Sequence, residues 1–161
     1  MRILTVLMGL MVPLAASARG GGQGFGMGLA IGSPTGINVK NMLGQSTALD
    51  ATLGLNFLNG RGFSVHACFL WQKALTTASS GKLDGYLGIG GKLGVYDDDE
   101  RGKHDNDHDD SVWIGPRAPA GIAFVFRGAP VDIWLEVAAV LWVVEEADLD
   151  FDGTLGVRYW F

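Results

Sequence analysis

Apolar residues alternate with small or polar residues along most of the chain, at a period of two rather than the 3.6 of a helix. In the first such segment, for example, Leu29 and Ile31 alternate with Gly28 and Ala30. Turn signals rich in Gly, Ser, Asn, Asp and Pro interrupt this pattern at 33–36, 44–46, 59–62, 79–81, 97–111, 127–130 and 145–150. These seven connections leave eight segments, with the spacing of a meander of antiparallel hairpins.

The two faces of these predicted strands differ in the same way in every segment. One face is apolar throughout, whereas the other combines glycines with isolated charged residues. A soluble sandwich would place abundant Lys and Glu on its second face, but a small and sparsely charged face is typical of a narrow, filled interior. Apolar outside and polar inside is the pattern of a membrane barrel. We therefore predict an all-β protein, an eight-stranded antiparallel up-and-down transmembrane β-barrel.

Composition narrows the class further. The 161 residues are enough for one domain, and a hydrophobic fraction of 48% excludes a disordered chain. A single cysteine excludes an internal disulfide framework. The formal charge of −5 argues against nucleic acid as a partner, because phosphates require a basic surface.

The N-terminus has the three parts of a secretory signal. Arg2 precedes an apolar run at 3–14, and a small-x-small cleavage site follows at 16–18. The run is shorter than the roughly 20 residues that a membrane-spanning helix needs. We predict a signal peptide at 1–18 and an exported barrel domain at 19–161.

Aromatic residues on the apolar face gather near the two ends of the predicted strands. If both chain ends are periplasmic, the periplasmic rim collects Phe25, Phe69, Trp71, Phe124, Phe126, Tyr159 and Phe161. Phe57 and Phe63 fall at the opposite rim. Aromatic girdles at both interfaces anchor membrane barrels. The same orientation places the longest connection, 97–111, outside the cell.

The last seven residues resemble the C-terminal strand of Gram-negative outer-membrane proteins. The apolar positions of this ending alternate and finish in phenylalanine: Leu155, Val157, Tyr159 and Phe161. In that family the last strand is recognised by the barrel-assembly machinery. The whole exported chain is similar in architecture to the small eight-stranded barrels of the OmpA/OmpX-like group. This resemblance implies a monomer in the outer membrane, in contact with membrane lipid and lipopolysaccharide, with a structural or surface-interaction role carried by its extracellular loops.

Charged residues of both signs fall on the predicted interior face. They are Lys40, Asp50, Lys92, Arg117, Asp132, Glu136 and Arg158. Opposite charges inside a barrel are expected to pair, because an unpaired buried ion is very costly. Eight strands leave an interior about wide enough for side chains only, which favours a salt-bridged plug. The alternative is a charged constriction in a narrow ion channel.

The acidic run at 97–110 contains eight carboxylates, which repel one another and favour a solvated loop. Its candidate cation ligands are Asp105, Asp107, Asp109, His104 and His108. The three aspartates are spaced like the first ligands of a calcium loop. However, Asp110 stands where that loop needs glycine, and Pro116 where it needs a bidentate glutamate. We therefore predict no metal and no cofactor, and keep cation binding by this run as an alternative.

A second acidic stretch precedes the last predicted strand. Asp148, Asp150, Asp152 and Gly153 match a calcium-loop opening more closely, but Tyr159 replaces its closing glutamate. We interpret this stretch as a polar turn that leads into the last strand.

Ser64 and His66 are the remaining candidates for catalysis. Some small outer-membrane barrels are lipid A deacylases or acyltransferases that use a Ser and a His near the rim. The alternation here directs both side chains inward, where Asp50 on the neighbouring strand is the expected partner of His66. We therefore predict no catalysis, with a lipid A-modifying enzyme as an alternative, and we expect Cys68 to be an unreactive packing thiol. A soluble barrel with the same pattern is a further alternative.

Overall fold

The computed structural model describes residues 24–56, 62–96, 111–143 and 148–161, which form eight strands. Their bounds are β1 (Phe25–Gly32), β2 (Thr35–Met42), β3 (Thr47–Asn56), β4 (Gly62–Thr77), β5 (Gly81–Tyr96), β6 (Ser111–Phe126), β7 (Val131–Trp142) and β8 (Asp148–Trp160). This part of the chain contains no helix that is long and apolar enough to cross a membrane.

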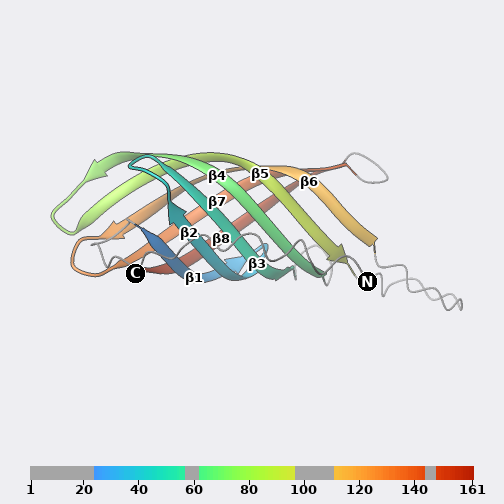
Figure 1. Cartoon of the computed structure of the whole chain (residues 1–161), viewed down its shortest axis with the longest axis horizontal. Helices are drawn as coiled ribbons and strands as arrows, with labels where there is room; N and C mark the ends of the chain where they lie inside the picture. The colour runs from blue at the N-terminus through green and yellow to red at the C-terminus, as the bar shows by residue number, and fades with distance from the viewer. Residues whose placement is uncertain (1–23, 57–61, 97–110, 144–147) are drawn as a thin grey trace, which may run out of the picture.

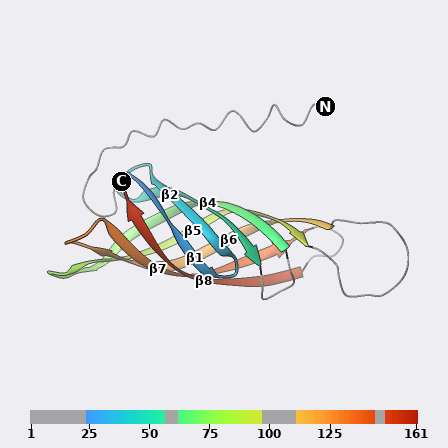
Figure 2. The ribbon, with the colours of Figure 1, turned by 90° about the horizontal axis from the view of Figure 1, so that it is seen from below.

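The strands close into a single antiparallel barrel with up-and-down topology (Figures 1 and 2). Each strand pairs with its neighbour in sequence, and β1 pairs with β8 to complete the ring. Because Gly26 lies opposite Trp160 and Gly32 opposite Thr154, this closure extends along nearly all of β1. Closure removes the free sheet edges that an open sheet would expose. The predicted fold class is therefore confirmed.

The outside of the barrel is apolar and the inside is polar, as the alternation predicts. Leu29, Ile31 and Leu87 are each 64–71% exposed on the outer face. Arg117 and Lys92, by contrast, are 1–2% exposed and point inward. This arrangement inverts that of a soluble protein and is the arrangement of a transmembrane barrel.

Inward-facing glycines allow the wall to curve tightly. At Gly28 an added Cβ would collide with the carbonyl oxygen of Val157, and at Gly36 with that of Leu53. Both oxygens belong to the adjacent strand, so neighbouring backbones approach each other more closely here than a side chain permits. The high glycine content is thus a requirement of the curvature of a small barrel.

Aromatic pairs gather at the end of the barrel that holds the C-terminus. Four pairs have ring centroids 4.9–6.1 Å apart: Phe25–Phe161, Phe69–Trp71, Phe124–Phe126 and Tyr159–Phe161. Phe63 is exposed toward the opposite end, whereas Phe57 lies outside the described residues. All residues of the aromatic rim predicted at the C-terminal end of the barrel therefore lie within the described structure.

Strand β4 extends beyond its neighbour β3 at the same end (Figure 1). Strand β3 begins at Thr47 opposite Trp71, but β4 continues to Thr77 with a bulge between Ala74 and Thr76. The β4–β5 hairpin therefore projects past the β2–β3 turn, and this projection shapes the outer surface beside it.

Candidate functional site

The lumen is the part of the molecule where charged side chains converge. All seven charged residues assigned to the interior by sequence are buried there, none more than 6% exposed. They come from six strands, and all of them except Lys40 fall into two groups of ion pairs, one around Arg117 and the other around Arg158.

Arg117 on β6 is at the centre of the first group. Its Nη2 lies 2.7 Å from Glu136 Oε1 on β7, and its Nε lies 3.3 Å from Asp152 Oδ2 on β8. Lys92 on β5 donates to both oxygens of Asp152, at 2.7 and 2.9 Å. The Tyr86 hydroxyl donates to Glu136 at 3.0 Å. This chain of contacts joins four consecutive strands across the lumen.

Asp152 is a member of this network that the sequence analysis assigned to a polar turn. That interpretation is wrong, because β8 already begins at Asp148 and pairs with β7 from Trp142 onward. The Asp152 side chain is fully buried and also accepts a hydrogen bond from Ser33 Oγ at 3.2 Å. The alternation alone could have placed Asp152 in the lumen. Asp152 lies two and four residues before Thr154 and Gly156, which face inward, and side chains at this spacing in a strand point to the same side.

Arg158 on β8 is at the centre of the second group. Its guanidinium carbon lies 4.3 Å from the centroid of the Trp134 ring, a cation–π distance. Its nitrogen atoms lie 3.7 Å from an oxygen of Asp50 and 4.0 Å from one of Asp132. Asp132 also accepts a 2.7 Å hydrogen bond from the Trp160 indole.

Lys40 behaves differently from the other interior cations. It lies opposite Asp50 in the register, yet no ion pair of Lys40 falls within the described ranges. Its ammonium instead lies 5.0 Å from the centroid of the Tyr86 ring. The ammonium therefore lies over an aromatic face at a cation–π distance.

Ser64, His66 and Cys68 all point inward from β4. The expected contact between His66 and Asp50 is not made, because the register places Thr52 opposite His66 and Asp50 opposite Cys68. Asp50 accepts from Asn38 at 2.9 Å instead. Ser64 Oγ and His66 Nδ1 have no hydrogen-bond partner among the residues described.

Cys68 is buried, and Arg117 Nη1 lies 3.6 Å from its sulfur. Metal ligands do not converge in the described strands and turns, which hold no group of three or more His, Cys, Asp or Glu side chains suited to a metal ion. The candidate cation ligands His104, Asp105, Asp107, His108 and Asp109 lie outside the described residues.

The C-terminal positions Leu155, Val157, Tyr159 and Phe161 all face outward and are 44–52% exposed. The Phe161 amide donates to the carbonyl of Phe25 at 2.9 Å, which ties the end of the chain to the start of β1. The terminal phenylalanine is thus part of the barrel seam and of the aromatic rim.

No protein-family model matches the chain, and no curated protein has a significantly similar sequence. Among solved structures, the crystal structure of the N-terminal β-barrel domain of Pseudomonas aeruginosa OprF superposes with a TM-score of 0.65. The superposition covers 88% of this chain and 99% of that one at 12% identity, so the likeness is one of fold. The chain thus shares the eight-stranded barrel fold of the OprF domain, which agrees with the architecture that the alternation of its eight segments predicts.

Proposed function

We propose that the protein is an integral outer-membrane barrel whose lumen is closed by a salt-bridged plug. Its role is structural or surface-interacting, and it is carried by the connections at the end opposite the C-terminus. The observation that supports this most strongly is the inversion of polarity, with leucine and isoleucine exposed and arginine buried. An apolar surface that surrounds a whole barrel is stable in lipid and aggregates in water.

Export and assembly complete the proposal. The signal peptide at 1–18 directs the chain out of the cytoplasm, and the strand ending in Phe161 is the segment that the assembly machinery recognises. The fold likeness to the OprF barrel domain is in keeping with the outer membrane of a Gram-negative bacterium. The surrounding partners are then phospholipid and lipopolysaccharide, and the barrel is a monomer without a cofactor.

The plug follows from the Arg117 group. Its four charged members are almost fully buried, and their ion pairs join β6 to β7 and cross the lumen from β5 and β6 to β8, so they fill the lumen and hold the wall together. Joint replacement of Arg117 and Glu136 by Met and Leu tests this role. We expect a changed melting temperature in detergent, and an unchanged one would contradict a structural plug.

Electrophoresis without boiling is the simplest test of the membrane barrel. A folded barrel in detergent migrates differently from its boiled form, and it precipitates when detergent is removed. A protein that migrates identically in both states and stays soluble without detergent would be a soluble barrel.

A narrow ion channel is the second candidate, because the described part of the lumen contains polar atoms without hydrogen-bond partners. Asn38 Oδ1 and two nitrogens of Arg158 are buried and make no hydrogen bond in the described structure. Recordings in planar bilayers separate the two candidates, since a plug gives no conductance steps and a channel gives them.

We propose no catalytic activity, and we expect His66→Ala to leave the lipid A of an overexpressing strain unchanged.

A further inference from the structure

The outer surface beside the projecting hairpin is hollowed into a groove of about 770 Å³. Two adjacent rows of outward-facing residues line it. The first row runs Trp71, Leu87, Ala120 and Val137, and the second runs Lys73, Gly85, Ile122 and Leu135. Ala120 leaves the hollow, since it is a small residue between Leu87 and Val137, whereas the Leu75 side chain covers Gly85.

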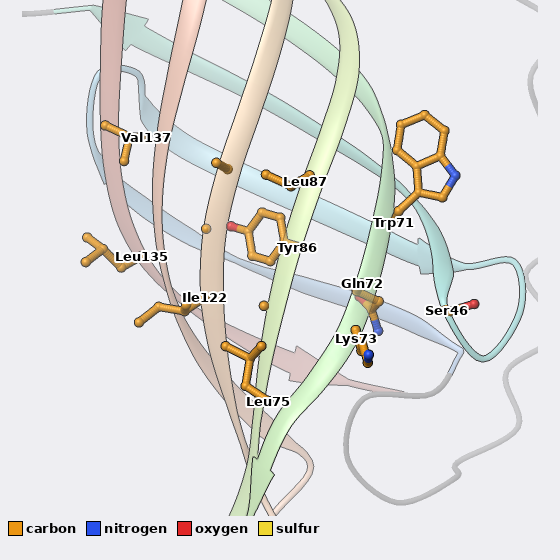
Figure 3. Close-up of a pocket in the computed structure, with 13 residues that line it drawn as sticks. Ser46, Trp71, Gln72, Lys73, Leu75, Tyr86, Leu87, Ile122, Leu135 and Val137 are labelled. Carbon is orange, nitrogen blue, oxygen red and sulfur yellow. The ribbon is translucent and has the colours of Figure 1, made fainter.

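The groove is polar at one end and apolar at the other. Figure 3 shows Ser46 and Lys73 on one side of the pocket, and Ile122, Leu135 and Val137 on the other. The lining between them is almost wholly apolar. A ligand that matches this groove has one polar end and a long apolar part.

The register shows how the groove lies in the barrel wall. Its polar end is at the rim, because Trp71 pairs with Thr47, the first residue of β3, and Ser46 belongs to the adjoining turn. Its apolar end lies deeper in the wall, because Val137 pairs with Gly153 inside β8. The groove therefore runs from the level of membrane headgroups into the apolar belt.

Lys73 supplies an available positive charge at the rim. It is exposed on the outer face and makes no ion pair with any described residue. Lys82, on the next strand, is 2.8 Å from Asp84 and is already neutralised. Tryptophan beside lysine at a membrane interface is the usual arrangement at headgroup level, and a lysine ammonium binds phosphate as a point charge.

We propose that this groove binds one glycerophospholipid, with an acyl chain over Ala120 and the phosphate against Lys73. The proposal rests on the proposed membrane location, because a barrel in lipid takes its ligand from the bilayer around it. The Ser46 hydroxyl, exposed at the same end, adds a donor for the phosphate oxygens.

Native mass spectrometry of the full chain, folded in detergent with added phosphatidylglycerol, tests this binding. We expect the wild-type barrel to retain one lipid. Ala120→Leu fills the groove and should abolish retention, whereas Ala118→Leu, two residues along the same outward face, should not. Lys73→Gln should weaken retention about fivefold, as expected for one lysine near an anionic headgroup, and Lys82→Gln should leave it unchanged.

Three results would overturn the proposal: no lipid retained by the wild type, equal retention by A120L and wild type, or equal retention of diacylglycerol, which lacks the phosphate. Unboiled electrophoresis of each variant shows whether it is folded, so a loss of lipid is read only on an intact barrel. Insertion of the wild type into vesicles without lipid retention refutes lipid binding in the groove and leaves the membrane barrel standing.

Discussion

Asp152 carries the sharpest prediction about stability, because two buried cations depend on it. Lys92 donates to both of its oxygens and Arg117 Nε lies 3.3 Å from one of them. Asp152→Asn keeps the shape of the side chain but removes its charge. Lys92 then has no carboxylate among the described residues, whereas Arg117 keeps Glu136 at 2.7 Å.

Loss of one partner from a buried ion pair costs about 3–5 kcal/mol of unfolding free energy. At a urea dependence of about 2 kcal/mol per molar, the midpoint of unfolding should fall by about 1.5–2.5 M. Urea titration in lipid vesicles measures this through tryptophan fluorescence, since Trp134, Trp142 and Trp160 are buried in the lumen.

Asp148→Asn is the matched control, because Asp148 belongs to the same strand but is exposed. We expect it to change the unfolding free energy by less than about 0.5 kcal/mol. Joint replacement of Lys92 by Met and Asp152 by Leu should cost less than D152N alone, because no lysine is left without its counter-ion. A D152N barrel as stable as D148N would refute the reasoning and indicate that water screens the lumen charges.

Three further predictions concern packing, reactivity and assembly. Gly156→Val should lower the yield of folded barrel in unboiled electrophoresis and cost about 1–3 kcal/mol, because its Cβ would meet the Trp134 ring. Gly153→Ala, with open space around its Cβ, is the control. Cys68 is buried, so maleimide should label it in urea and not in the folded barrel; labelling of the folded protein would contradict its packing role. Phe161→Ala should reduce the folded barrel recovered from cells, since Phe161 closes the seam against Phe25; wild-type recovery would argue against the C-terminal signal.

The alternation alone predicted which side chains of each strand point into the lumen and which point outward. Side chains of a strand point to opposite sides at a period of two, so one apolar face over eight segments determines which residues lie outside. Lys92, Arg117 and Arg158 could be assigned to the lumen in this way. Asp152 was missed because its acidic neighbours resemble a turn, although it alternates in step with the residues that face the lumen.

Contacts between strands were less predictable. The pairing of His66 with Asp50 required a particular stagger of β3 against β4, and the observed stagger places Thr52 there instead. The link from Lys92 on β5 to Asp152 on β8 crosses the closed lumen, and no local pattern encodes it. The groove depends on how far the β4–β5 hairpin projects past β3, which is again a matter of stagger.

The sequence by itself determined the barrel, its polarity and its terminal strand, because these depend on a local period that every segment repeats. Only the tertiary structure decided which charges meet, which polar atoms have no partner and where the outer surface is hollowed. The physical reason is that alternation specifies the side of the sheet on which a residue lies, whereas its neighbours across the sheet follow from register, curvature and closure.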